Sequence, residues 1–511
     1  MGVLAFFLAA SFSLATAATA PKTGGTLRFS LEKDIVNVNP FERASSVNKD
    51  VGSLAFECLL TSDKDDNLRP SLATAWEVSK KGDEYAFTLR KGVKFHNGKE
   101  MTAEDVLWSI NYARDPKNAA YGRDALLPIA SVSAADASVL RITLREPYVP
   151  FLATLTSFQT FPIVPQGSVP PERGKMALYP PGTGPFMMVD YKPNQVIAFK
   201  RFDQYWQKGL PYLEAVHFRP VEDATVRLTA LRAGDFDVVE RVAYPEAIRI
   251  QKGEFKDISL KVADASGYIA PVFNTERPPF DDPRLRRAAL YAIDKSKILD
   301  GVTWGLGAVG DQRMHRESRW FVTLPDRKRD IEKARALLRE AGYPNGIRIK
   351  GQVSRTKRDQ DVMQLLQSQL REANIQMELE VRDFAKHMND LRDGSFTLSM
   401  SAGSTNIDPD AVYYRNFHTE KTELRISNYP RYSNPRVDRL LEEGRREADF
   451  QRRHQIYKEV VEILLEDVPE IALGFTPYVF AFRSHVHGFD VSPYGVFYYG
   501  LGGLAMTWMD R

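Results

Sequence analysis

Apolar and polar residues alternate with a period of two in several short stretches of the chain, and this pattern predicts β-strands. The first stretch is residues 26–31, and a second covers residues 85–90, where three large apolar side chains share one face. Residues 196–200 and 347–350 show the same alternation. Strands are therefore expected along much of the chain.

Helices are predicted between these strands, because apolar residues recur there at helical spacing behind a capping residue. Thr102 begins a capping box with Asp105, and further helix starts are predicted at Asp282, Asp330 and Asn434. A proline follows two of these caps, at the first helical position where it is best tolerated. The alternation of strands and helices predicts a mixed α/β protein.

The length of 511 residues exceeds what one hydrophobic core usually supports, so two or three lobes are expected. The proline-rich stretch 162–185 is the best candidate for an internal boundary. Sixty-nine basic and 66 acidic residues give a net charge of +3 without a basic stripe. This balance argues against a nucleic-acid partner.

The N-terminal residues 1–17 form an apolar stretch that ends in Ala15-Thr16-Ala17, which is typical of a cleaved export signal. A membrane anchor is the alternative, but the stretch is short for a bilayer crossing of roughly 20 residues. The one cysteine, Cys58, lies far from the cleavage site and cannot be a lipidated first residue. We expect a free, unlipidated periplasmic protein without internal disulfides.

Several short motifs match known functional patterns but lack the structural context that the corresponding chemistry requires. Residues 305–310 match GxGxxG, but they follow a predicted helix rather than a strand, so we interpret them as a loop. His485 and His487 point to opposite faces of a strand and lack further ligands nearby. No cofactor or metal is expected, and no GxSxG, HExxH or P-loop motif indicates an enzyme.

The most specific stretch of the sequence is residues 85–106, which combine a strand, a turn and a capped helix. Together with other motifs in order, it resembles the extracellular solute-binding proteins, family 5, which include dipeptide-, oligopeptide- and nickel-binding proteins. The other motifs occupy residues 70–76, 182–186, 202–206, 231–237, 273–275, 279–289, 334–342 and 432–435.

The resemblance implies an α/β fold of the periplasmic binding protein-like II type: two lobes joined by a hinge, plus an extra inserted lobe. Lobe I would comprise residues 22–57, 182–272 and 478–511. The inserted lobe II would be residues 58–181, and lobe III residues 273–477. A monomer is expected, which encloses a solute between closing lobes and delivers it to the permease subunits of an ABC importer in the inner membrane.

The ligand is less clearly indicated than the fold. In peptide-binding members of the family, an acidic residue shortly before an Asp-Pro motif holds the N-terminal ammonium of the peptide. Here Thr405 occupies that position ahead of Asp408-Pro409, which puts ordinary dipeptide binding in doubt. Asp408 or Asp410 could supply the missing charge, or the Asp-Pro pair could simply form a turn.

Hydroxyl and amide side chains near this motif suit sugars or carboxylates, and Arg316 near Trp320 could meet an acid or belong to a solvated loop. Our ligand-binding candidates are Asn37, Asn39, Phe41, Phe273, Asn274, Arg316, Trp320, Ser401, Ser404, Thr405, Asn406 and Asp408.

A peptide or related polar solute is the first expectation for the ligand, and an opine-like or glycosidic solute is the second. A secreted hydrolase that uses Asp408 and Asp410 is an alternative of a different class. Nothing in the sequence indicates that these two carboxyls form a matched acid and base.

Overall fold

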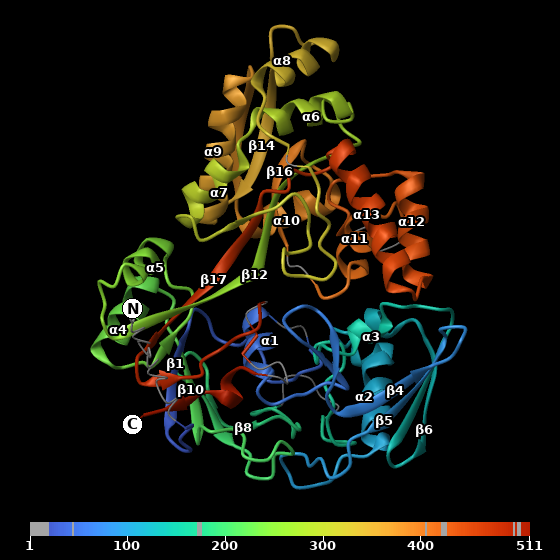
Figure 1. Ribbon diagram of the computed structural model, residues 1–511, viewed down its shortest axis with the longest axis vertical. Helices are drawn as coiled ribbons and strands as arrows, with labels where there is room; N and C mark the ends of the chain where they lie inside the picture. The colour runs from blue at the N-terminus through green and yellow to red at the C-terminus, as the bar shows by residue number, and fades with distance from the viewer. Residues whose placement is uncertain are drawn as a thin grey trace, which may run out of the picture.

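The computed structural model describes residues 20–42, 45–170, 176–325, 327–403, 406–420, 427–493, 496–497 and 502–510 (Figure 1). The predicted signal segment 1–17 and the ligand candidates Ser404 and Thr405 lie outside the described residues. The molecule has an upper lobe and a lower lobe in the orientation of Figure 1, and two long strands run between them.

The largest sheet in the described part of the chain has eleven strands and passes through both lobes. Its order is β15 (Ile375–Arg382), β14 (Ile347–Ser354), β16 (Leu398–Gly403), β12 (Ile258–Phe273), β17 (Gly474–Arg483), β11 (Val238–Val239), β1 (Thr26–Leu31), β10 (Ala215–Pro220), β9 (Val196–Arg201) and β8 (Phe186–Lys192), with β13 (Ala308–Val309) paired to β17.

Three smaller sheets complete the strand pairing of the described residues. The four-stranded sheet lies in the lower lobe, at the right of Figure 1. The sheets are β4 (Ala73–Val78), β5 (Glu84–Leu89), β7 (Val139–Leu144) and β6 (Ile129–Asp136); β2 (Leu60–Ser62) and β3 (Leu68–Pro70); and β18 (Val486–His487) and β19 (Trp508–Met509).

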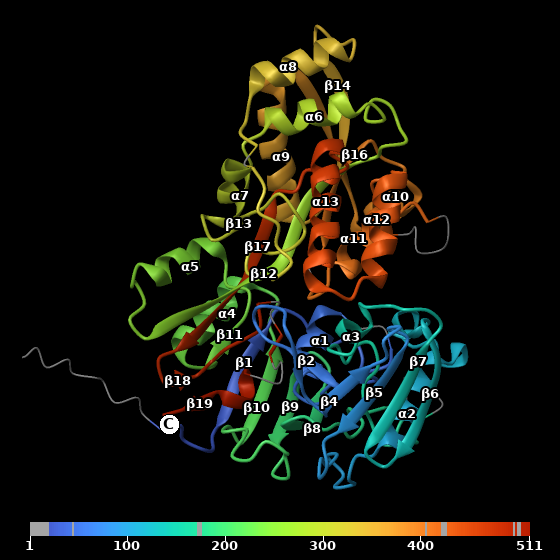
Figure 2. The ribbon, with the colours of Figure 1, turned by 45° about the vertical axis from the view of Figure 1, so that its right-hand side comes forward.

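The helices cover the sheets in both lobes (Figure 2). Those of the lower lobe are α1 (Ser46–Gly52), α2 (Ala103–Arg114), α3 (Phe151–Thr154), α4 (Ala224–Ala233) and α5 (Tyr244–Gln251). Those of the upper lobe are α6 (Pro283–Ala292), α7 (Lys295–Thr303), α8 (Ile331–Glu340), α9 (Lys357–Glu372), α10 (Phe384–Asp393), α11 (Asp410–Phe417), α12 (Pro435–Arg446) and α13 (Phe450–Asp467). No helix among the described residues has both the length and the apolarity needed to cross a bilayer.

The strands β12 and β17 connect the lobes as an antiparallel pair (Figure 1). Their register shifts between Ala263 and Gly267, which marks an irregularity in the middle of the connection. The hydrophobic cores on either side are separate. In the lower lobe a large core packs around Phe29 and a smaller one around Leu231, and in the upper lobe two cores pack around Leu366 and Tyr457.

The predicted local elements are confirmed. The strand predicted at residues 85–90 is β5, and α2 begins after Thr102, whose backbone N–H donates to the Asp105 carboxylate at 3.1 Å. The carboxylate of Asp282 accepts from a backbone N–H at the start of α6. Residues 305–310 are largely a loop after α7, as predicted, with only the short β13 inside them.

Candidate functional site

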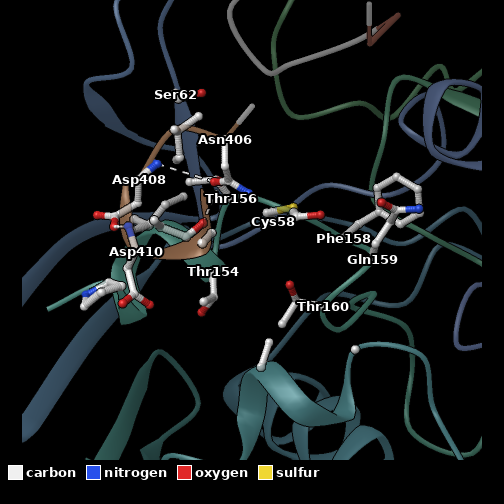
Figure 3. Close-up of a pocket in the computed structure, with 18 of the residues that line it drawn as sticks. Cys58, Ser62, Thr154, Thr156, Phe158, Gln159, Thr160, Asn406, Asp408 and Asp410 are labelled. Atoms are coloured by element: carbon white, nitrogen blue, oxygen red, sulfur yellow. Dashed lines mark hydrogen bonds between the residues drawn. The ribbon is translucent and has the colours of Figure 1, made fainter. Parts of the chain in front are cut away.

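A cavity of about 790 Å³ lies between the lobes. Its lower wall comes from residues 49–62, 121–128 and 148–160, and its upper wall comes from residues 406–420 together with Ser427 and Arg445. The segments of the two walls are more than 200 residues apart in the sequence. Figure 3 shows side chains from both walls turned toward the same space.

The lower wall is rich in neutral hydrogen-bonding side chains. The short helix α3 and the turn after it place Thr154, Thr156, Ser157, Gln159 and Thr160 along the cavity (Figure 3). Because a hydroxyl can donate one hydrogen bond and accept two, this wall can meet either kind of polar group on a solute. The segment 154–160 therefore offers neutral hydrogen-bonding groups to a solute.

Asp408 on the upper wall is held by a buried ion pair. Both of its carboxylate oxygens accept from Arg453, at 2.6 and 2.7 Å, and its side chain is only 9% exposed. One of these oxygens also accepts from the backbone N–H of Asp410 at 2.9 Å. Asp408 therefore takes part both in the turn before α11 and in a bidentate ion pair with α13.

Asp410, two residues later, is shared between the lobes. Its carboxylate accepts from the Tyr148 hydroxyl of the lower lobe at 2.9 Å and lies 3.1 Å from Nε of Arg445. Burial raises the pKa of the Asp410 carboxyl to about 6, and the positive charge of Arg445 opposes this shift. The carboxyls of Asp408 and Asp410 thus have different partners and different surroundings.

Glu57 is a third carboxylate of the cavity, buried on the lower wall. It accepts from the Tyr205 hydroxyl at 2.8 Å and from the indole nitrogen of Trp206 at 3.0 Å. The aromatic pair of the motif at residues 202–206 therefore does more than pack, since it orients an acidic side chain beside the cavity.

Two of the predicted site residues line the cavity, Asn406 and Asp408. The side-chain oxygen of Asn406 accepts from the backbone N–H of Asp408 at 3.4 Å (Figure 3). The other described candidates do not line it, and their role as ligand contacts stays a prediction. They are Asn37, Asn39, Phe41, Phe273, Asn274, Arg316, Trp320 and Ser401.

Several of these eight candidates have identifiable packing or hydrogen-bonding roles elsewhere. Phe41 packs against Tyr112, and the Asn39 amide oxygen accepts from the backbone N–H of Phe41. Phe273 belongs to the core of the upper lobe, and Trp320 packs against α13.

The remaining candidates include one surface residue and several structural positions. Asn274 donates to the carbonyl of Gly394, and Ser401 is buried on β16. Arg316 is exposed, and Asn37 accepts through its backbone carbonyl from Asn48.

The sequence did not identify residues 154–160 or Glu57 as part of the site. The segment 154–160 contains four hydroxyl side chains and a glutamine in seven residues, and it begins four residues after Pro150. This density of polar groups was the available signal, but polar residues are also typical of ordinary surface turns.

No group of three or more His, Cys, Asp or Glu side chains suitable for a metal ion occurs among the described residues. The two histidines singled out in the sequence have separate carboxylate partners. Nε2 of His485 lies 3.0 Å from Asp237, and Nε2 of His487 lies 2.7 Å from Asp510.

Residues 67–423 match the family described as bacterial extracellular solute-binding proteins, family 5 Middle. The glutathione-binding protein GsiB of Escherichia coli K12 is 26% identical over 467 residues, which cover 90% of this chain and 91% of that protein.

Solved structures show the same fold. The binding protein AgaA of A. tumefaciens R10, in complex with agropinic acid, is 27% identical with a TM-score of 0.78, over 95% of this chain and 99% of AgaA. The ABC transporter substrate-binding protein CtaP of Listeria monocytogenes is 22% identical with a TM-score of 0.85, over 96% and 100% of the two chains. The family match extends over most of the sequence, and the chain belongs to the bacterial extracellular solute-binding proteins of family 5.

Proposed function

We propose that the protein is the periplasmic component of an ABC importer, and that it captures a peptide or related polar solute in the cavity between its lobes. The observation that carries this proposal is the cavity itself. Its walls come from two lobes with separate cores, connected by β12 and β17, so a change in the angle between the lobes would open or close it.

The size and chemistry of the cavity suit a small polar solute. Its volume of about 790 Å³ lies within the ~300–1,000 Å³ range of small-molecule sites. The hydroxyl and amide groups of residues 154–160 suit amide, carboxylate or hydroxyl groups of a ligand. GsiB is named for glutathione and AgaA was solved with agropinic acid, and both of these ligands fit this description.

An opine-like or glycosidic solute is a second candidate. It is favoured because the three carboxylates of the cavity already accept hydrogen bonds or ion pairs from other residues of the protein. Asp408 is bound by Arg453, Asp410 by Tyr148 and Arg445, and Glu57 by two aromatic donors. A solute ammonium would compete with these donors, and an ammonium without a partner costs several kcal/mol to bury. A solute without a free primary amine avoids this competition.

The same contacts support binding rather than hydrolysis. Both oxygens of Asp408 accept from Arg453, so this carboxylate is occupied in the fold and poorly placed to act as a base paired with Asp410. We propose that the chain releases its solute unchanged to the permease, where ATP is hydrolysed by another subunit.

The division into lobes and the export route belong to the same proposal. We propose cleavage after residue 17 and release into the periplasm without a lipid anchor. The lobe boundaries at 57/58, 181/182, 272/273 and 477/478 place the junction between lobes I and III within or next to β12 and β17.

A thermal-shift screen followed by calorimetry tests this proposal. The panel contains glutathione, peptides of two to five residues, their N-acetylated forms, and opines. A true ligand at 100 times its dissociation constant stabilises the protein by about 2.7 kcal/mol. Preference for N-acetylated peptides or opines over free peptides would favour the second candidate, and no stabilisation by any member would contradict both.

A further inference from the structure

The segment 146–149 of the lower lobe meets residues 445–446 of α12 beside the cavity. The backbone N–H of Val149 donates to the carbonyl oxygen of Arg445 at 2.9 Å. Next to it, Glu146 and Arg446 form an ion pair at 3.4 Å, with both side chains more than half exposed. A short stretch of each lobe therefore contacts the other through the backbone and through side chains.

Beside this contact, Asp410 and Arg445 of the upper lobe are tied to Tyr148 of the lower lobe. One oxygen of Asp410 accepts from the Tyr148 hydroxyl, and the other faces Nε of Arg445. The Arg445 guanidinium lies between two rings, 3.7 Å from the centroid of Tyr414 and 4.9 Å from that of Tyr148. We call Tyr148, Asp410 and Arg445 the interlobe clamp.

The geometry points to the interlobe clamp as the device that holds the lobes closed, with Tyr148 and Arg445 as positioning residues for solute capture. This inference rests on the proposed function, because it assigns to these residues the closed form in which solute is retained. Separation of the lobes would remove the tyrosine hydroxyl from a buried carboxylate and one aromatic face from the guanidinium. Because both contacts are lost when the lobes separate, they favour the closed form.

The interlobe clamp also connects closure to occupancy of the cavity. Its three residues line the cavity. From Tyr148 the chain runs through α3 into the segment 154–160, whose hydroxyl side chains also line the cavity. A solute that binds this segment restrains the same stretch of chain that reaches Arg445. Solute binding and clamp formation should therefore strengthen each other, as linked equilibria require.

Hydrogen exchange at Val149 measures the clamp directly. Prolines at positions 147 and 150 lack an N–H, so Tyr148 and Val149 carry the two exchanging amides of this four-residue stretch. The Val149 amide is protected by a carbonyl of the opposite lobe, and its exchange rate without added solute reports how often the lobes separate.

Two variants weaken the clamp while retaining most of each side chain. Tyr148→Phe removes the hydroxyl and keeps the ring, and Arg445→Lys keeps the charge but loses the planar group between two rings. We expect Val149 to exchange about tenfold faster in Tyr148→Phe, a change equivalent to ~1.4 kcal/mol. The exposed ion pair of Glu146 with Arg446 should contribute less to closure. Glu146→Gln should therefore change the exchange rate of the Val149 amide by less than about twofold.

Arg439→Lys is the matched control, because Arg439 is an exposed arginine on the same helix. Amides of α2 serve as the internal reference for intact folding. Wild-type exchange at Val149 in both clamp variants, or equal acceleration in Arg439→Lys, overturns the inference.

Solute affinity separates this inference from the proposed function. Weaker binding in Tyr148→Phe with unchanged exchange would mean that Tyr148 contacts solute rather than holding the lobes, which overturns the clamp and leaves the function standing. Faster exchange in a protein that binds no member of the solute panel would support the clamp and contradict the function.

Discussion

The two walls of the cavity differ in how their polar groups are used. The lower wall at residues 154–160 presents neutral hydroxyl and amide groups, whereas the upper wall contains Asp408 and Asp410, both bound to arginines. Buried charges require partners of opposite charge, so the fold itself satisfies the ionic groups of the upper wall. The comparison shows that the charges of Asp408 and Asp410 are paired within the upper lobe and at the lobe interface, and we propose that the neutral segment 154–160 recognises the solute.

Removal of the charge that balances Asp408 should have the largest effect. Arg453→Met keeps the length of the side chain but leaves the Asp408 carboxylate buried without its cation. We expect a loss of about 3–5 kcal/mol in the free energy of unfolding, measured by urea denaturation. If solute affinity fell while stability were unchanged, the charge would serve recognition, and the contrast between the walls would be wrong.

Arg436→Met provides the control for this variant. Arg436 of α12 pairs with Glu459 of α13, the helix that also carries Arg453, but the Arg436 side chain is 51% exposed. Exposed pairs contribute about 0–1 kcal/mol, so this variant should unfold close to the wild-type urea concentration.

The pH dependence of stability tests the state of Asp410. Its folded pKa of about 6 lies above the ordinary value for an aspartate because of burial. The carboxyl therefore contributes stability that is fully present below pH ~4 and lost as the pH rises through about 6. Between pH 4 and 7.5, wild type should lose stability relative to Asp410→Asn, on the order of 2 kcal/mol, in urea titrations.

The opposite sign would carry a different meaning. If wild type gained stability over Asp410→Asn as the pH rose, the ion pair with Arg445 would outweigh burial, and Asp410 would be a stronger contributor to closure than its pKa suggests. Asp203→Asn is a suitable control, because that side chain is 69% exposed and does not line the cavity.

A hydroxyl of the lower wall should matter for the solute and little for the fold. Thr160→Val replaces a hydroxyl by a methyl group of similar size on the cavity surface. Loss of one neutral hydrogen bond of about 1 kcal/mol predicts a dissociation constant about fivefold higher by calorimetry, with the urea midpoint nearly unchanged. Thr74→Val, at an exposed position of β4, should leave affinity unchanged.

The assignment of recognition to the lower wall would fail if Arg415→Gln weakened binding and Thr160→Val did not. Arg415 lines the upper wall and is exposed. That result would transfer recognition to a charge of the upper lobe.

Local elements could be predicted because their causes are local. The strand β1 covers the predicted residues 26–31, and α2 follows the predicted capping box, since side-chain periodicity and capping depend on neighbouring residues. The family could be identified for the same reason, because its motifs are short stretches such as residues 85–106. The match to residues 67–423 confirms it.

The cavity was only partly predictable. Asn406 and Asp408 were candidates because they lie next to and within the Asp408-Pro409 motif, but the sequence left open whether this motif forms a turn or whether Asp408 or Asp410 supplies charge to a solute. In the structure Asp408 forms the turn, through the backbone N–H of Asp410, and its charge is paired with Arg453. Its contact with a solute ammonium stays a prediction. Arg453 lies 45 residues further along the chain, and no local pattern joins the two.

The sequence by itself determined the α/β elements, their order and the family, because these follow from periodicity, capping and contiguous motifs. Only the tertiary structure decided which polar residues line the cavity and which neutralise one another. That choice depends on distances between segments such as 148–160 and 406–420, which are far apart in the chain. Partners are selected by burial and charge in three dimensions, and a linear pattern contains neither.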